Sequence, residues 1–240
     1  MGALVLTAAV VAVGAVIQSS TGFGFALFVV PVLAVAVGPK EAVVTMSVIG
    51  VPLSIANAIR WRADVDGRAA LTVTLAAVAT MPLGLWLLAT AGDRTLTAIV
   101  GAVVVGLTLW LWRGLSLPPG LRTELAAGAV SGVLATGTGT SGPPLVIAFQ
   151  AVGMEAATFR ATLAATFAIQ SVVALGGFWA RGLVTASSGR LTLAGLPAMA
   201  LGALAGDRIF ARMDGARFRA AVLVLLAASG MLALTEALLR

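Results

Sequence analysis

Apolar residues fill long stretches of this chain and leave only short polar segments between them. The stretches fall at 4–22, 25–37, 42–59, 69–91, 95–112, 121–136, 144–152, 156–180, 191–206 and 218–239. Those of about 17–25 residues are long enough to cross a hydrocarbon core about 30 Å thick as helices. Because they lack the alternation of a membrane strand, we predict an all-α integral membrane protein rather than a barrel.

The composition supports this prediction. Of the 240 residues, 60% are hydrophobic and 10% are charged, whereas about a quarter of the residues of a soluble domain are charged. The mean hydropathy is +1.08. No basic segment precedes the first apolar stretch, so we expect this stretch to belong to the mature protein and not to a signal peptide. The net charge of +6 comes mostly from residues between apolar stretches, where charges act as topology signals, so we expect no nucleic-acid partner.

The chain contains no Cys and no His. Disulfides, thiolate chemistry and most transition-metal sites are therefore excluded, and we expect neither a metal nor another cofactor. The acids all lie near the ends of apolar stretches, so none is an expected proton relay; they are Glu41, Asp64, Asp66, Asp93, Glu124, Glu155, Asp207, Asp214 and Glu236. An intramembrane enzyme, which needs a nucleophile with a base or a metal, is the least favoured class.

Two segments interrupt the apolar pattern with small and hydroxyl-bearing residues: QSSTGFGF at 18–25 and ATGTGTSGPP at 135–144. Non-helical backbone in hydrocarbon costs several kcal/mol for each unsatisfied group, so both breaks must be enclosed by protein or line a cavity. Their glycines permit positive φ, and Pro143 and Pro144 suit the first turn of a new helix. Free N–H groups and the positive end of the helix dipole then make an anion site.

The breaks and three nearby polar positions supply the predicted substrate-binding residues. They are Gln18, Ser19, Ser20, Thr21, Gly22, Gly24, Asn57, Thr136, Gly137, Thr138, Gly139, Thr140, Ser141, Gly142 and Gln170. The alternative for the glycines is close helix packing, which is our interpretation of GAVSG at 128–132. Gln18, Asn57 and Gln170 either line the pathway or form hydrogen bonds between helices. GTGTSG at 137–142 also matches a dinucleotide-binding pattern, but no strand precedes it, so we discount a nucleotide.

The chain contains an internal duplication. The repeated segments, 114–115 residues apart, are GPKEA (38–42) and GMEA (153–156), MPLG (81–84) and PAMALG (197–202), and GDR (92–94) and GDR (206–208). We therefore expect two membrane repeats, 1–113 and 121–240, joined by a linker at 114–120. Duplicated halves with paired helix breaks are the sequence pattern of a secondary transporter with its site at the breaks.

Each break divides its apolar segment into two arms, which form either a fully crossing broken helix or a re-entrant hairpin. Two hairpins place ten basic residues on one side of the membrane and five on the other, whereas two full crossings give eight and seven. The ten are Arg60, Arg62, Arg68, Arg113, Arg122, Arg160, Arg208, Arg212, Arg217 and Arg219, and the five are Lys40, Arg94, Arg181, Arg190 and Arg240. The positive-inside rule therefore favours hairpins, three crossing helices in each half, an inverted repeat, and arginine-rich loops in the cytoplasm.

Arg160 and several tryptophans lie near the ends of apolar stretches. Arg160, five residues into its stretch, either attracts an anion or snorkels to the membrane interface. The tryptophans most simply form an interfacial aromatic belt; they are Trp61, Trp110, Trp112 and Trp179.

The two-half organisation and several segments resemble the sulfite exporter TauE/SafE family of bacterial membrane transporters. The segments are QSSTGFGFALFVVPVL (18–33), GTGTSGPPLV (137–146) and the MPLG and PAMALG pair. The resemblance extends over essentially the whole chain. It implies export or uptake of small sulfur-containing anions, such as sulfite, sulfonates or sulfur-bearing carboxylates, across the bacterial inner membrane.

We therefore expect a multi-pass protein of the bacterial inner membrane that moves such anions by alternating access. The alternative is an anion channel with the same broken-helix site. The expected partners are a small anionic substrate and the lipid bilayer. A coupling ion, either a proton or sodium, and a homodimer stay open.

Overall fold

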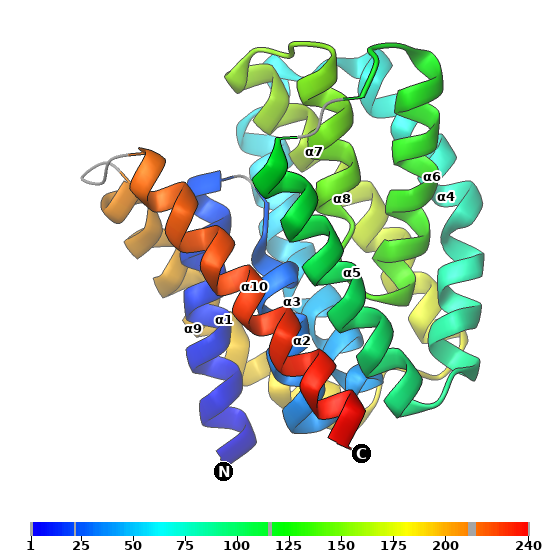
Figure 1. Cartoon of the computed structure of the whole chain (residues 1–240), viewed down its shortest axis with the longest axis vertical. Coiled ribbons are helices and arrows are strands. Elements are labelled where there is room, and N and C mark those ends of the chain that lie inside the picture. Colours follow the sequence, from blue (N-terminus) through cyan, green and yellow to red (C-terminus); the bar gives the residue numbers. More distant parts are fainter. Residues whose placement is uncertain (1, 22, 115–116, 211–214, 240) are drawn as a thin grey trace.

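The computed structural model describes residues 2–21, 23–114, 117–210 and 215–239, with the backbone alone at 20–21, 207–210 and 215–222. Among these residues every regular element is a helix, which confirms the predicted all-α class (Figure 1). The first half comprises α1 (Gly2–Thr21), α2 (Phe25–Val37), α3 (Pro39–Arg60), the short 3-10 helix η1 (Arg62–Asp64), α4 (Gly67–Thr90) and α5 (Asp93–Arg113). The second comprises α6 (Leu121–Gly137), α7 (Gly142–Ala151), α8 (Ala156–Ala180), α9 (Ala186–Phe210) and α10 (Gly215–Leu239).

Five helices of the described chain are long and apolar enough to cross a membrane. They are α1, over Gly2–Ser19, and α3, α4, α5 and α8. Two further apolar helices, α2 and the segment Leu223–Leu239 of α10, are shorter. This set of helices is the architecture of a multi-pass membrane protein.

Local sequence explains where several helices begin and end. Pro39 opens α3 after Gly38, whose φ of 90° favours glycine. Asp66 precedes α4, and its carboxylate accepts a hydrogen bond from the N–H of Ala69 at 3.0 Å, which satisfies a donor of the first turn. Gly114 ends α5 in the left-handed conformation, at a φ of 61°.

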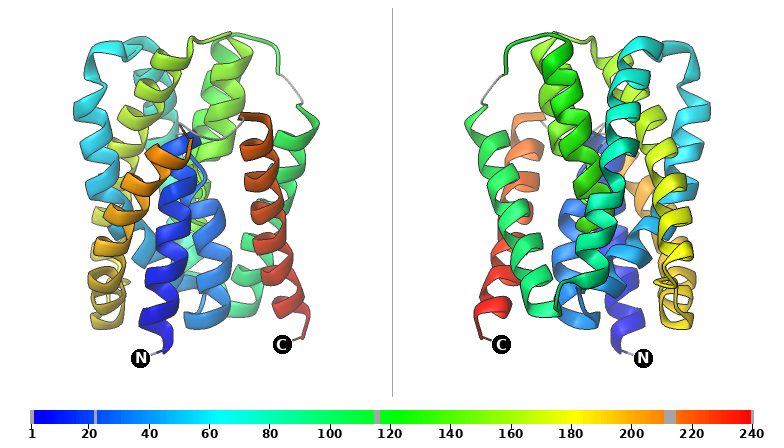
Figure 2. Two further views of the ribbon diagram at one scale, coloured as in Figure 1. Left: turned by 90° about the vertical axis from the view of Figure 1, so that its left-hand side faces the viewer. Right: turned by 90° about the vertical axis from the view of Figure 1, so that its right-hand side faces the viewer.

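The chain reverses direction at both breaks. α1 packs against α2, and α6 against α7. In Figure 2, α2 returns toward the end of the molecule at which α1 begins, and α7 returns toward the opposite end, where α6 begins. This is the hairpin arrangement that the distribution of basic residues favours. The relation of the two halves as an inverted repeat in a membrane stays a prediction.

The loops gather at two opposite ends of the helix bundle. Figure 2 shows the turns at 61–66 and 152–155 together with 117–120 at one end, and the turns at 91–92 and 181–185 at the other. We name the first of these the arginine-rich end, because its turns are bordered by Arg60, Arg62, Arg68, Arg113 and Arg122. The beginning of α1 and the end of α10 lie at the opposite end.

The long arm of each hairpin packs on a helix of the other half. α1 lies along α9, and α6 lies along α4. Gly132 of α6 approaches the carbonyl group of Ala77 in α4 so closely that a Cβ would overlap it, and Gly202 of α9 approaches that of Ala12 in α1 in the same way. The interpretation of GAVSG at 128–132 as a close-packing segment is therefore confirmed.

The short arms, α2 and α7, are enclosed by other helices. α2 packs against α1, α3, α5 and α10, and its residues Val29, Val30 and Leu33 are fully buried. Every residue of α7 from Pro143 to Phe149 is buried. Protein therefore surrounds the non-helical backbone next to these arms, as its high free energy in hydrocarbon requires.

Candidate functional site

The two breaks meet at one cavity of about 90 Å³. The first break contributes Gln18 and residues 23–27 to its wall, and the second contributes residues 139–142. Ala135 of α6 and residues of α3 and α8 supply the rest of the described wall. The structure thus brings the two breaks together as predicted, while their depth in a bilayer stays a prediction.

The first break turns at Gly24. Its φ of 97° lies in the left-handed region that favours glycine. The carbonyl oxygen of Gly24 accepts the N–H of Phe28 at 3.2 Å, which begins the hydrogen-bonding of α2. The N–H groups of Phe25, Ala26 and Leu27 have no partner among the described residues, as expected at a helix start without a side-chain cap. All three residues line the cavity.

The second break turns at Gly139, whose φ is 70°. Just before it, the carbonyl oxygen of Leu134 accepts the N–H of Thr138 at 2.9 Å and that of Thr140 at 3.3 Å. The Thr138 hydroxyl donates to the same carbonyl at 3.1 Å and lies 2.7 Å from the Thr140 hydroxyl. These bonds end α6 and hold the turn that leads into α7.

The start of α7 presents few N–H groups. Its first residues are Gly142, Pro143 and Pro144, and the two prolines have no N–H. The N–H groups of Ser141 and Gly142 have no partner among the described residues, and both residues line the cavity. The hydroxyl of Ser131 in α6 donates to the carbonyl oxygen of Ser141 at 2.9 Å, which fixes the turn relative to α6.

Gln170 of α8 joins the cavity wall to this turn. Its side chain is 2% exposed, and its Nε2 donates to the Ser131 hydroxyl at 3.2 Å. Gln170 and Gln18 both line the cavity. Gln170 therefore forms a hydrogen bond between helices and also lines the cavity, so the two alternatives for this residue do not exclude each other.

The cavity wall combines polar and apolar residues and carries no described charged side chain. Among the described residues, no Asp, Glu, Lys or Arg lines it. The starts of α2 and α7 both reach it, and a helix start carries a partial positive charge of about half an elementary charge. An anion in this cavity would meet N–H groups, hydroxyls and amides without a fixed countercharge.

Aromatic side chains form part of the apolar wall. A Cβ at Gly142 would lie 3.4 Å from Cβ of Phe23 and 3.6 Å from Cζ of Phe167, so this glycine fits between two phenylalanines. Phe25, 4% exposed, also borders the cavity. These rings offer no hydrogen-bond acceptor and limit the room for a hydration shell.

The structure divides the predicted binding residues into three groups. Those that line the cavity are Gln18, Gly24, Gly139, Thr140, Ser141, Gly142 and Gln170. Those described elsewhere are Ser19, Asn57, Thr136, Gly137 and Thr138. Gly22 lies outside the described residues, as do the side chains of Ser20 and Thr21.

Several residues away from the cavity serve helix packing. The Thr136 hydroxyl donates to the carbonyl oxygen of Met81 at 2.7 Å and so joins α6 to α4. The Ser19 hydroxyl donates to the carbonyl oxygen of Val16 at 3.1 Å, within α1. Gly137 packs against α4. A hydroxyl or glycine in a break is therefore not by itself part of the cavity.

Most of the cavity-lining residues of α3 and α8 are not among the predicted binding residues. From α3 the lining residues are Met46, Ser47, Gly50 and Ser54, and from α8 they are Phe167, Gln170, Ser171 and Ala174. On each helix these residues recur every three or four positions, which places them on one face. A row of small and hydroxyl-bearing residues at helical spacing within an apolar stretch was the signal that would have identified them.

Glu124 is buried, although it lies near a segment end as the sequence indicates. It is 4% exposed, and its Oε2 has no hydrogen-bond partner among the described residues. It belongs to the first turn of α6, where the helix dipole favours a carboxylate. No group of three or more His, Cys, Asp or Glu residues in the described chain is placed to hold a metal ion.

A family model described as Sulfite exporter TauE/SafE matches residues 6–232. The match includes both breaks and all of the cavity-lining residues. No curated protein and no solved structure matches the chain.

Proposed function

The chain belongs to the sulfite exporter TauE/SafE family, and from this membership we propose that it is a secondary transporter of small sulfur-containing anions. Membership makes it a membrane anion transporter, with a small anion as its substrate. The proposal adds that the anion binds in the cavity between the two breaks and crosses the bacterial inner membrane by alternating access.

One observation carries this proposal: two helix starts face the same uncharged cavity. The unpartnered N–H groups of Phe25, Ala26, Leu27, Ser141 and Gly142 all belong to lining residues. Backbone donors of this kind, aided by the helix dipoles, hold anions without a basic side chain. A site without a fixed positive charge also lets the anion leave, which transport requires.

The cavity size narrows the substrate class. Its volume of about 90 Å³ is well below the roughly 300–1,000 Å³ of pockets for drug-sized ligands. A sulfite-sized oxyanion or a short sulfonate fits this space. The rings of Phe23 and Phe167 favour an anion that has shed most of its water.

The packing of the two halves supports alternating access. In the order of the chain, α1 to α5 of the first half correspond to α6 to α10 of the second half. Under this correspondence the α1–α9 contact is equivalent to the α6–α4 contact, and both contacts are extensive. The same exchange returns the α3–α8 and α5–α10 pairs to themselves. This pattern is expected of repeats related by a two-fold axis through the site, with the arginine-rich end in the cytoplasm.

An anion channel is the alternative function, since a channel could use the same site. A transporter must change conformation in each cycle, so its flux saturates with substrate and shows counterflow. Flux through a channel of this kind rises almost linearly with concentration and shows no counterflow.

The test compares anion binding to the wild-type protein and to Gly142→Ala by calorimetry. The added Cβ would lie in ordinary contact with Phe23 and Phe167, so it occupies cavity space without a clash. We expect affinity for sulfite to fall about ten-fold, because the added methyl group keeps the anion away from the N–H groups of Ser141 and Gly142 and so weakens a hydrogen bond to a charged group. Gly176→Ala is the control, because a Cβ there meets nothing within 4 Å.

Sulfite, thiosulfate, methanesulfonate, sulfate and acetate would be titrated in turn. We expect the sulfur oxyanions of sulfite size to bind more tightly than acetate. Equal sulfite affinity for Gly142→Ala and the wild type would show that the anion site lies outside this cavity.

A further inference from the structure

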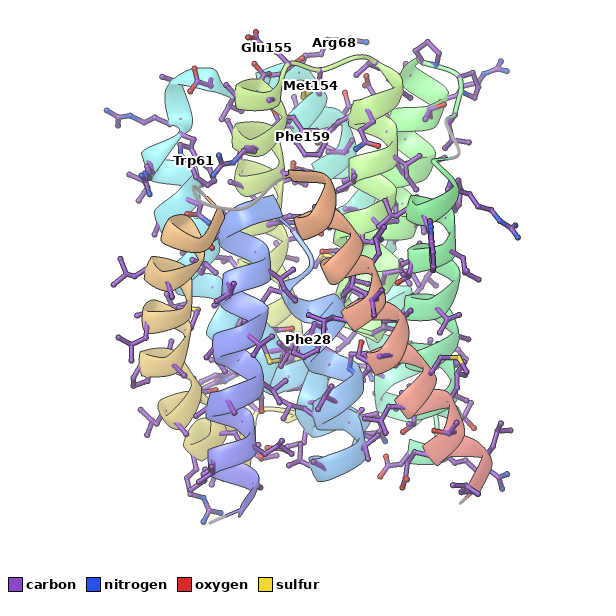
Figure 3. All side chains as sticks on the ribbon, turned by 60° about the vertical axis from the view of Figure 1, so that its left-hand side comes forward. Phe28, Trp61, Arg68, Met154, Glu155 and Phe159 are labelled. Carbon is purple, nitrogen blue, oxygen red and sulfur yellow. The ribbon has the colours of Figure 1, made fainter. Side chains whose placement is uncertain are left out.

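Trp61, which follows the last residue of α3, lies next to two arginines. Cζ of Arg160, from α8, is 4.6 Å from the centre of its indole ring, and Cζ of Arg60 is 6.0 Å from it. Figure 3 shows Trp61 farther from the tip of the arginine-rich end than Arg68 and Glu155. The ring that the two arginines share therefore lies deeper in the helix bundle than Arg68 and Glu155 do.

The guanidinium of Arg160 lacks a countercharge. Its Nε is buried and has no hydrogen-bond partner among the described residues. Neither Arg160 nor Arg60 forms an ion pair with a carboxylate in the described chain. The nearby Asp66 caps α4 through its carboxylate, at 3.0 Å from the N–H of Ala69, and Asp64 of η1 is exposed to solvent. A buried, unpaired donor of a cation is costly unless a ligand uses it.

Arg160 lies at one end of the contact between α3 and α8. These helices pack against each other, and they run in opposite directions (Figure 2). With Trp61 opposite Arg160, the antiparallel register places Asn57 near the level of Ala164, and Ser54 near that of Phe167. Ser54 and Phe167 both line the cavity, which agrees with this register.

One face of α3 therefore connects the cavity to Trp61. Ser47, Gly50 and Ser54 line the cavity, and Asn57 and Trp61 continue the same spacing of three and four residues toward the arginine-rich end. These side chains are small or polar up to Trp61, in a helix that is otherwise apolar. Their position explains Asn57, which the cavity itself does not use.

We propose that Arg160, held over Trp61, is a second anion-binding position, from which small oxyanions pass along the α3–α8 contact to and from the cavity. The guanidinium offers the charge that the cavity lacks, and planar donors suit an oxyanion. Stacking on the indole ring holds the guanidinium in place without neutralising it. The inference rests on the proposed function in one respect, since the cavity is taken as the anion site. The positive potential that Arg160 creates around Asn57 can be measured separately.

The experiment uses a single cysteine as a probe of the electrostatic potential. Because the chain has no Cys, Asn57→Cys introduces the sole thiol. Its reaction rates with the anionic sulfonatoethyl methanethiosulfonate and the cationic trimethylammonioethyl methanethiosulfonate are measured in the full-length protein without substrate. The ratio of the two rates reports the local charge. Ile59→Cys, on a flank of α3 where the side chain is 64% exposed, is the control thiol.

We expect the anionic reagent to react faster at position 57, and Arg160→Gln to lower the ratio about ten-fold or more, since one nearby charge is removed. Arg160→Lys should keep most of the wild-type ratio of the two rates. Arg62→Gln, an exposed arginine of the same end, should change it little. In the Ile59→Cys protein, Arg160→Gln should leave the ratio unchanged.

Two results would overturn the inference. One is a rate ratio at position 57 that does not change with Arg160→Gln, and the other is a thiol there that reacts with neither reagent. A structural role alone for Arg160 would slow both reagents together. Should Arg160→Gln fail to fold, Arg160→Lys still tests the inference, because loss of the anionic preference with the charge retained would contradict it. Failure of the proposed function would appear separately, as absent calorimetric binding with the rate ratio intact.

Discussion

The Ser131 hydroxyl in α6 donates to the carbonyl oxygen of Ser141 at 2.9 Å, across the second break. Ser131 is fully buried, and its oxygen also accepts from Nε2 of Gln170 at 3.2 Å. One hydroxyl thus links α6, the start of α7 and α8. The direction of the N–H groups at Ser141 and Gly142 depends on this link.

Ser131→Ala should weaken sulfite binding several-fold and lower the melting temperature. The substitution leaves the partly buried carbonyl of Ser141 and the buried amide of Gln170 without this hydroxyl, which costs about 1–3 kcal/mol. Calorimetry and a thermal melt measure the two effects. Thr108→Ala is the control, since it removes a buried hydroxyl that bonds only within α5, to Val104 at 2.6 Å. Sulfite affinity equal to that of the control would show that this link does not position the site.

Gly139→Ala should abolish most anion binding. A side chain at a φ of 70° is strained, and the added Cβ would lie 3.3 Å from Cγ2 of Val30, a buried residue of α2. The turn that presents Thr140 and Ser141 to the cavity must therefore shift. The strain alone costs about 1–2 kcal/mol. Calorimetry on the purified variant measures the loss of binding.

The matched control for that variant is Gly153→Ala. Gly153 has a φ of 66°, and a Cβ there meets nothing within 4 Å. Both variants should therefore lose stability in thermal melts, and Gly139→Ala should lose more because of its contact with Val30. Only Gly139→Ala should lose affinity, and an equal loss in both would attribute the effect to backbone strain at any site.

Gly132→Ala should destabilise the protein strongly. Its Cβ would overlap the carbonyl group of Ala77, and main-chain atoms move only with the whole helix. Overpacking of this kind costs typically about 1–3 kcal/mol. The melting temperature in detergent measures it, with Gly106→Ala as the control, since a Cβ at Gly106 meets nothing within 4 Å. Equal melting temperatures would mean that α4 and α6 can separate freely.

Anion binding should survive removal of the carboxylates nearest the helix starts of α3 and α8. Glu41 accepts from the Thr185 hydroxyl at 3.1 Å, Glu155 is exposed, and neither lines the cavity. The double variant Glu41→Gln, Glu155→Gln should keep wild-type sulfite affinity in calorimetry. Proton-coupled uptake into vesicles tests whether either acid carries a coupling proton. Complete loss of binding would establish a carboxylate as part of the site.

The helix breaks could be predicted from sequence because their signals are local. Gly24 and Gly139 adopt the positive φ that the glycines indicated, and Pro143 and Pro144 lie in the first turn of α7. Each of these residues constrains its own backbone, whatever surrounds it. The meeting of the breaks followed from the internal duplication, which relates distant segments.

The rest of the cavity could not be predicted because it depends on which helix faces meet. Small and hydroxyl-bearing residues mark more than one face of α3 and α8, and only the packing of these helices selects Ser47 and Ser171 for the cavity wall rather than Thr45 or Thr166. Thr136 is the opposite case, a predicted binding residue that does not line the cavity. It lies in the predicted break, but its hydroxyl bonds to Met81 of α4, a partner that the sequence does not identify.

The pairing of α1 with α9 sets an order for biosynthesis. α1 is made before the other described helices, yet the surface that receives it, including Gly202, is made only with α9. Until α9 is synthesised, the face of α1 that packs on it must contact lipid or the insertion machinery. A similar dependence applies to two fragments divided at 114–120. Each fragment lacks the helix that covers its long arm, so the native fold should form only when both fragments are in the same membrane.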